Sequence, residues 1–158
     1  MVYGPTDYSL SPLFLDEISN KVDSCTLPLL IGGDFNLLRS PSDKNTNNFS
    51  WVLADAFNDF ISSCALREIP RVGSRFTWTN HQISPIRSVL DRVLVCPSWG
   101  ALFPLATLKT KAIFGSDHAP LILDAGLQRA FSPPRFQFDA SWLLVEGFHD
   151  LLGSRIHD

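Results

Sequence analysis

An excess of basic residues, paired cysteines and long apolar runs are all missing from this chain of 158 residues. Its 13 lysines and arginines are outnumbered by 16 aspartates and glutamates, so the overall basic charge that marks many nucleic-acid binders is absent. An acidic total does not exclude such a partner, because carboxylates that bind a metal ion count as negative until the ion is bound. No apolar stretch approaches the roughly 18 residues of a membrane-spanning helix, which predicts no membrane partner.

The cysteines, Cys25, Cys64 and Cys96, are odd in number and widely spaced. No pair has the spacing of a metal-binding motif, so we interpret them as small buried residues of a protein in a reducing compartment. The first residues lack a basic start followed by an apolar run, so we expect no signal peptide and an intracellular location. No internal repeat is visible in the chain.

The composition, 45% apolar and 18% charged, is typical of a globular domain. The character of the sequence changes after Asp124, where Gly126 to Arg135 includes Ser132-Pro133-Pro134 and is typical of a linker. We therefore predict one domain over residues 1–124. Residues 125–158 are predicted to be a linker and the start of a further segment.

Apolar residues at helical spacing predict an amphipathic helix that begins at Ser11-Pro12. Ser11 has the hydroxyl of a capping residue, and Pro12 suits the first helical position. Phe14, Ile18 and Val22 recur every four residues and form the expected buried stripe.

A second amphipathic helix is predicted from about residue 50 to residue 64, with Trp51 in the core. Short runs of apolar, β-branched and aromatic residues predict strands between turn signals. The predicted strands are 28–34, 66–69, 75–80, 88–95, 108–114 and 119–123, with a short helix or turn over 97–102. Loosely alternating strands and helices, with several hairpin-like neighbours, predict a layered α/β domain with a mixed sheet.

The apolar run at 27–31 ends in Gly32-Gly33 and then in Asp34 and Asn36. If extended geometry continues past the strand, the Asp34 and Asn36 side chains point to the same face. A carboxylate and an amide placed together there suit a hard metal ion and a phosphate oxygen. The alternative is that these residues only form a turn.

The predicted strand over 88–95 places Asp91 on one face with Val89, Val93 and Val95. A carboxylate on an otherwise apolar face is costly to bury without a partner. Asp91 is therefore expected at the rim of the sheet or in a pair.

Four short motifs follow one another along the chain, each in or beside a predicted strand. They are Gly33-Asp34-Phe35-Asn36, Phe76-Thr77-Trp78, Leu90-Asp91-Arg92 and Ser116-Asp117-His118-Ala119-Pro120. In this order they resemble the endonuclease/exonuclease/phosphatase superfamily, the DNase I-like nucleases. The details are similar to the endonuclease domain of plant LINE-type (non-LTR) retrotransposons. The resemblance covers residues 2–123, and the tail resembles the segment that leads to a reverse transcriptase.

The resemblance implies a DNase I-like layered α/β sandwich with mixed or antiparallel sheets flanked by helices. It implies that Asp34 and Asn36 orient the attacking water and contact the phosphate. It also implies that His118 hydrogen-bonds the scissile phosphate while Asp91 orients its imidazole. A carboxylate of this kind fixes the tautomer of a histidine and favours its charged form.

Further roles follow from the same resemblance. Asp117 matches a metal-ligand aspartate for Mg²⁺ or Mn²⁺, and Tyr3 matches a tyrosine near the phosphate. Trp78 is either close to the DNA face or packed in the core. The implied partners are DNA and a reverse transcriptase domain in cis, and the implied location is the nucleus.

The chain also departs from the family pattern. An asparagine and a metal-binding glutamate on the family's early strands have no counterpart, because the only glutamates are Glu17, Glu68 and Glu146 and none fits. We therefore expect an N-terminally truncated copy of the domain. Three functions stay open: a Mg²⁺-dependent DNA-nicking phosphodiesterase, a non-catalytic remnant of a decayed retroelement, and another phosphoesterase of the superfamily.

Overall fold

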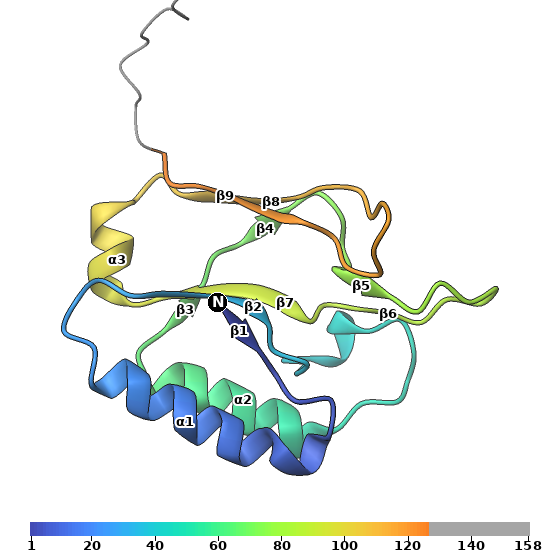
Figure 1. The fold of residues 1–158 in the computed structure, drawn as a ribbon, viewed down its shortest axis with the longest axis horizontal. Coiled ribbons are helices and arrows are strands. Elements are labelled where there is room, and N and C mark those ends of the chain that lie inside the picture. Colours follow the sequence, from blue (N-terminus) through green and yellow to red (C-terminus); the bar gives the residue numbers. More distant parts are fainter. Residues whose placement is uncertain (127–158) are drawn as a thin grey trace, which may run out of the picture. The chain divides into compact units, whose positions relative to one another are not determined.

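The computed structural model describes residues 1–126, which belong to one compact unit (Figure 1). Almost all of the predicted linker and tail lies outside the described residues, so the domain boundary at 124 stays a prediction. Within the described part, no helix has both the length and the apolar character needed to cross a membrane.

The described elements comprise helices, short 3-10 turns and strands. The helices are α1 (Ser11–Asp23), α2 (Trp51–Ser63) and α3 (Pro97–Leu102), with 3-10 turns at Tyr8–Leu10 and Pro41–Asp43. The strands are β1 (Val2–Tyr3), β2 (Leu30–Asp34), β3 (Arg67–Glu68), β4 (Arg71–Val72), β5 (Trp78–Thr79), β6 (Arg87–Ser88), β7 (Asp91–Val95), β8 (Thr107–Thr110) and β9 (Leu121–Asp124).

The strands form two main sheets and one small hairpin. The first sheet has the order β1-β2-β7-β3, the second β4-β8-β9, and β5 pairs with β6. Parallel pairs (β1 with β2, β4 with β8) occur beside antiparallel pairs (β2 with β7, β8 with β9), so both main sheets are mixed. Figure 1 shows α1 and α2 under the first sheet and the second sheet above it. This confirms the predicted layered α/β fold with mixed sheets.

The two faces of the first sheet bury separate apolar clusters. Phe35, Phe57 and Leu94 belong to the cluster between this sheet and helices α1 and α2. Val93 and Val95 belong to the cluster between the two sheets. Alternate residues of β7 therefore face opposite layers, as the predicted strand pattern requires.

Helix α1 begins where the sequence predicts a helix, but not with the predicted cap. Ser11 is already helical, because the 3-10 turn before it runs directly into α1 and the Ser11 amide donates to the Tyr8 carbonyl. Its hydroxyl is buried without a hydrogen-bond partner. The residue that does cap is Asp7, which accepts a 3.0 Å hydrogen bond from the Ser9 amide at the start of the 3-10 turn.

Helix α2 begins one residue after Ser50, whose hydroxyl caps it. The prediction that Trp51 packs in the core is wrong: its side chain is 65% exposed at the first helical position and packs edge-on against Phe49. Phe60 is buried in its place. The interpretation of the cysteines as buried is also wrong: Cys25 is exposed, and Cys64 and Cys96 are only partly buried.

The predicted strands extend beyond the observed ones. The run 108–114 ends at Thr110 in β8, and two other runs are interrupted within their length. Within the run 75–80, only β5 forms a paired strand, and the run 88–95 is divided between β6 and β7. The break falls at Val89 and Leu90, whose backbone groups bond outside the ladder: the Val89 amide donates to the Asp43 carbonyl and the Leu90 amide to Thr77 Oγ1. A strand pattern cannot show such a break, because the residues on both sides remain β-formers.

Candidate active site

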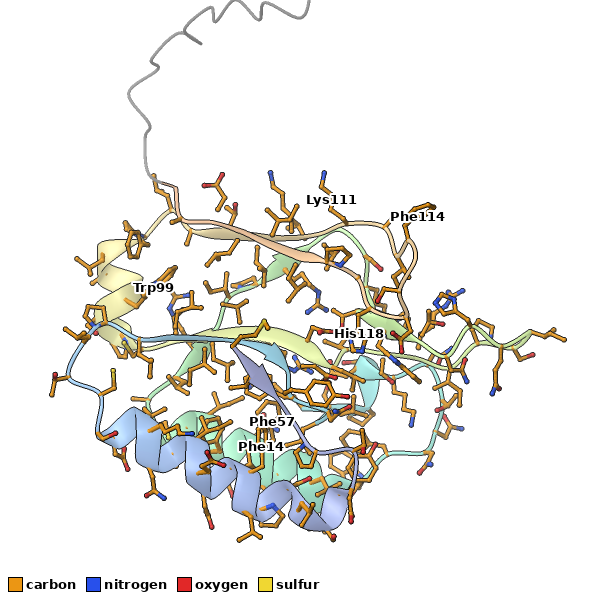
Figure 2. All side chains as sticks on the ribbon, viewed as in Figure 1. Phe14, Phe57, Trp99, Lys111, Phe114 and His118 are labelled. Atoms are coloured by element: carbon orange, nitrogen blue, oxygen red, sulfur yellow. The ribbon has the colours of Figure 1, made fainter. Side chains whose placement is uncertain are left out.

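The candidate site forms where one end of the first sheet meets the loop before β9. Asp34 ends β2 and Asp91 begins β7, and the two residues are direct antiparallel partners. His118 lies in the loop that leads into β9 of the second sheet. Figure 2 shows its imidazole on the side of this loop that faces the first sheet. Residues 84 positions apart in the sequence (Asp34 and His118) are thereby brought into one cluster.

The imidazole of His118 contacts both aspartates. Its Nδ1 lies 2.9 Å from Asp91 Oδ2, and its Nε2 lies 3.8 Å from Asp34 Oδ2. Asp91 is thus paired at the rim of the sheet, which agrees with what its position on an apolar face predicts. A carboxylate at Nδ1 favours the tautomer that carries its proton there and leaves Nε2 directed at Asp34.

Backbone geometry after β2 differs from the extended path that the strand pattern allows. Asn36 has a positive φ of 52°, so the chain turns and does not continue the strand. Its amide donates a 2.8 Å hydrogen bond to Asp34 Oδ1, and its side-chain Nδ2 donates a 2.8 Å bond to the Gly4 carbonyl. The turn that was the alternative interpretation of these residues is therefore present. It also fixes the Asp34 carboxylate, so the turn and a functional Asp34 are compatible.

Gly33 allows β1 to approach this corner closely. It has a φ of +150°, and a Cβ built there would lie 2.0 Å from the Val2 carbonyl oxygen. Any side chain at this position would push β1 away from β2. The glycine therefore permits the register that places Tyr3 beside Asp34.

The pKa values of the central pair are shifted in a direction that suits proton exchange. Burial raises the pKa of Asp34, with a further contribution from the charge of Asp91, although the hydrogen bond from the Asn36 amide opposes the shift. For His118, burial lowers the pKa, but the hydrogen bond to Asp91 and the charges of Asp91 and Asp34 outweigh it, so the net pKa lies above 6.5. Both groups hold a proton to higher pH than they would in solution.

Asp117 belongs to the same loop but lies in an exposed position. Trp78 Nε1 donates a 2.9 Å hydrogen bond to Asp117 Oδ2, and this bond lowers the pKa of the carboxyl. The Thr79 amide donates to the Asp117 carbonyl at 3.0 Å. The Trp78 side chain is partly exposed, so it is not a core residue. Its hydrogen bond to Asp117 also fixes its orientation.

Tyr3 lies on β1, in parallel register with Asp34. Its side chain is 72% exposed and lines a surface hollow along α1 with Phe14 and Glu17. Within the described residues, its hydroxyl makes no hydrogen bond to the His118 cluster. The structure therefore brings Asp34, Asp91 and His118 into contact, with Asp117 next in the chain to His118 and Tyr3 at the margin.

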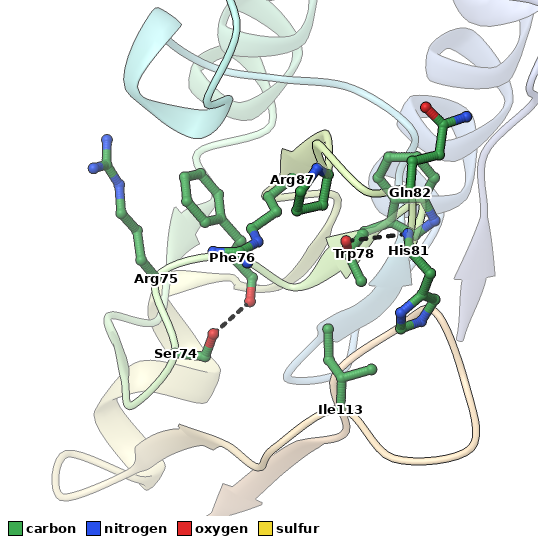
Figure 3. A pocket seen from close by; sticks show the side chains of 10 residues that line it. Ser74, Arg75, Phe76, Trp78, His81, Gln82, Arg87 and Ile113 are labelled. Carbon is green, nitrogen blue, oxygen red and sulfur yellow. Dashed lines mark hydrogen bonds between the residues drawn. The ribbon is translucent and has the colours of Figure 1, made fainter.

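A groove of about 570 Å³ begins beside Trp78 and follows the β5–β6 hairpin (Figure 3). Its lining combines aromatic and basic side chains: Phe76, Trp78, Arg75 and Arg87. The Arg75 guanidinium also lies 5.0 Å from the centre of the Phe76 ring. Positive charge beside aromatic faces is suited to a nucleic-acid strand. The overall acidic charge of the chain gave no sign of this local composition.

An ion network around the buried Arg92 lies on the opposite face of β7, and the sequence interpretation missed it. The Arg92 side chain is 4% exposed and bonds Glu68 at 2.8 Å and Asp43 at 2.6 Å. Arg39 donates a 2.9 Å hydrogen bond to the same Glu68. The available signal was Arg92 itself, a charged residue on an apolar face between Leu90 and Leu94. Glu68, which fits no metal-binding role in the sequence, serves this network.

The carboxylates of the site provide the oxygen ligands that a hard cation prefers. In number they fall short of a complete site, because residues 1–126 contain no group of three His, Cys, Asp or Glu side chains that could hold a metal ion. Mg²⁺ is commonly held by one or two carboxylates, with water and substrate phosphate oxygens as the other ligands. The residues present fit a cation that is shared with a bound phosphate.

Comparison with known proteins identifies the fold. The sequence matches no protein-family model and no curated protein. The endonuclease domain of TRAS1, a telomere-specific non-LTR retrotransposon, superposes with a TM-score of 0.63 at 16% identity, over 80% of this chain and 56% of that one. The 3′-5′ exonuclease NExo from Neisseria meningitidis superposes with a TM-score of 0.57 at 19% identity, over 73% and 52%.

A third solved structure is similar to the chain to the same extent. It is the Neisseria 3′ phosphatase NExo bound to a product DNA hairpin, with a TM-score of 0.58 at 18% identity over 73% of this chain and 51% of that one. The fold is therefore DNase I-like, as the four motifs indicate. The chain spans about half the length of each of these solved structures.

Proposed function

We propose that this chain is a nuclease that hydrolyses phosphodiester bonds of DNA at the Asp34–Asp91–His118 cluster. The observation that carries the proposal is the position of His118, hydrogen-bonded to Asp91 through Nδ1 and facing Asp34 through Nε2. A carboxylate, an imidazole and a second carboxylate in this order can move a proton and stabilise negative charge on a phosphate. The DNase I-like fold supports the same reaction class.

Each residue has a proposed role that follows from its environment. Asp34, with its raised pKa, accepts a proton from the attacking water, and the turn at Asn36 holds its carboxylate in place. His118, with its raised pKa, presents a positively charged Nε2 to a phosphate oxygen. Asp91 fixes the imidazole. Tyr3 is proposed to reach the phosphate from the margin of the site.

Asp117 is the proposed protein ligand of a divalent cation, Mg²⁺ or Mn²⁺. Its carboxyl is exposed, has a lowered pKa and is oriented by Trp78, so it is ionised and accessible. A cation bound there would neutralise the charge that develops on the phosphate and the leaving oxygen.

The groove supports a nucleic-acid substrate over a small phosphate ester. Arg75 and Arg87 are placed to bind backbone phosphates, and Phe76 and Trp78 offer faces for stacking. The sequence motifs favour a finer assignment: a DNA-nicking endonuclease domain of a plant LINE-type element, acting in the nucleus with a reverse transcriptase domain in cis. This finer assignment is also a proposal.

The proposal is tested by incubating the purified chain with supercoiled plasmid and Mg²⁺. Nicking is expected, with complete loss in EDTA and a loss of at least about 100-fold in His118→Ala, the magnitude of a general acid–base contribution. Asp55→Ala, which changes an exposed carboxylate on α2, is the matched control and should nick normally. Circular dichroism confirms that each variant is folded.

Two other functions give different results in the same experiment. A non-catalytic remnant, favoured by the incomplete set of metal ligands, would be folded but would not nick under any condition. A phosphatase of the superfamily would spare the plasmid and release phosphate from a 3′-phosphorylated DNA hairpin. Nicking that persists in His118→Ala would remove the proposed site from the mechanism.

A further inference from the structure

Thr77 is the central residue of the Phe76-Thr77-Trp78 motif. Its side chain is completely buried, with 0% exposure. Its Oγ1 accepts two hydrogen bonds of 3.0 Å, one from the Leu90 amide and one from the Asp91 amide. A single hydroxyl therefore serves two consecutive backbone amides at the first residue of β7.

The two amides lie where one strand ends and the next begins. Strand β6 ends at Ser88, β7 begins at Asp91, and Leu90 lies between them. A buried amide without an acceptor costs roughly 1–3 kcal/mol. The Thr77 hydroxyl supplies the acceptor for both, and in doing so it fixes the backbone that carries the Asp91 carboxylate.

The main chain of Thr77 holds the other half of the site. Its carbonyl accepts a 2.7 Å hydrogen bond from the Ala119 amide, directly after His118, and its own amide donates to the Ser88 carbonyl at 2.9 Å. Trp78, the next residue, is bridged to His118 and holds the Asp117 carboxylate. Thr77 thus bonds to both of the segments whose side chains meet in the 2.9 Å contact between His118 and Asp91.

We propose that Thr77 is a positioning residue that sets the distance between Asp91 and His118, and so prepares the imidazole for the reaction. The expected effect on nicking rests on the proposed function. The effect of Thr77 on the distance between Asp91 and His118 does not. Serine would keep the hydroxyl acceptor. Valine has nearly the same shape as threonine and removes it, so the valine variant separates the hydrogen bonds from the packing.

The experiment compares Thr77→Val, Thr77→Ser and a control with the same chemical change, Thr107→Val. Thr107 is an exposed threonine on β8 of the second sheet, outside the candidate site. In Thr77→Val we expect kcat for nicking to fall about 100-fold with an unchanged KM, the cost of misplacing a reacting group by about 1 Å. Thr77→Ser should restore most of the loss, and Thr107→Val should resemble the wild type.

A second measurement does not depend on activity. Amide hydrogen exchange of Leu90 and Asp91 should accelerate in Thr77→Val and stay slow in Thr77→Ser and Thr107→Val. The Nδ1 proton of His118, identified in the NMR spectrum by its absence in His118→Gln, should be lost or shifted only in Thr77→Val.

The two measurements separate the inference from the proposed function. A wild-type chain that does not nick, with the expected exchange pattern, overturns the nuclease proposal and leaves the positioning role supported. Unchanged exchange and an unchanged His118 proton in a folded Thr77→Val overturn the positioning role, whatever the activity. A kcat loss that Thr77→Ser does not reverse also overturns it.

Discussion

His118 Nδ1 lies 2.9 Å from Asp91 Oδ2, across the junction between the loop before β9 and the first strand residue of β7. Without His118, the Asp91 carboxylate would lie at an apolar rim with no partner, which is energetically costly. Without Asp91, the His118 imidazole would have no fixed tautomer. The two side chains therefore stabilise each other, and the pair is the geometric centre of the proposed chemistry.

Replacing Asp91 by asparagine should reduce nicking by about 10²–10⁴-fold, because the amide no longer favours the tautomer and charge that the reaction needs. Steady-state nicking of supercoiled plasmid measures the loss. Asp55→Asn is the matched control and should be unaffected. Normal activity of a folded Asp91→Asn would show that the contact is structural only.

Asp34→Asn should stabilise the fold while it abolishes nicking. The pKa of Asp34 is raised, so the native protein holds this proton more tightly than the unfolded chain does, and ionising Asp34 costs stability as pH rises through the folded pKa. At neutral pH the neutral amide avoids this cost and can still accept the bond from the Asn36 amide. Urea unfolding at pH 7 should show a gain of roughly 1 kcal/mol, of the size common for single stabilising substitutions. A loss of stability would contradict the assigned burial effect.

The stability difference between the wild type and His118→Gln should depend on pH. The folded pKa of His118 is raised above 6.5, so its charged form contributes stability that is fully present below that value. This contribution is lost as pH rises through the folded pKa. Thermal unfolding between about pH 5 and pH 9 should show the wild type ahead at acidic pH and the gap closing at alkaline pH. A gap that widens with pH would reverse the assigned sign.

Arg92→Ala should destabilise the protein by about 3–5 kcal/mol, because it leaves Glu68 and Asp43 without their buried partner. The control is Lys21→Ala, which removes the exposed i,i+4 pair of Lys21 with Glu17 and should cost less than about 1 kcal/mol. Denaturant unfolding measures both. Equal effects of the two substitutions would mean that the network contributes no more than a surface pair.

Gly33→Ala should weaken β1 and destabilise the protein by roughly 1–3 kcal/mol, since the new methyl group meets the Val2 carbonyl in a backbone conformation that disfavours side chains. Gly32→Ala is the neighbouring control, because its Cβ would have only an ordinary contact, 3.4 Å to Val93 Cγ2. Chemical denaturation of the two variants tests the difference. Similar stabilities would show that β1 can shift without cost.

The sequence by itself determined the elements that local chemistry specifies. The spacing of Phe14, Ile18 and Val22 was enough to predict α1, and the alternation around β7 was enough to place Asp91 on the face of Val93. The order of four motifs indicated the DNase I-like fold, which the solved structures confirm. These features depend on residues that are only a few positions apart. The periodicity of helices and strands allows such neighbours to be recognised from the sequence alone.

Only the tertiary structure decided how the motifs meet. Thr77 bonds to Leu90 and Asp91, 13 and 14 residues away, and Arg92 finds Asp43 across 49 residues. The exposure of Trp51 likewise depends on where α2 lies beside the sheet, not on its own spacing. Contacts of this kind depend on strand register and on backbone groups that carry no sequence signal, because every residue offers the same amide and carbonyl. The sequence therefore shows the residues of the site separately, and only the fold brings them together.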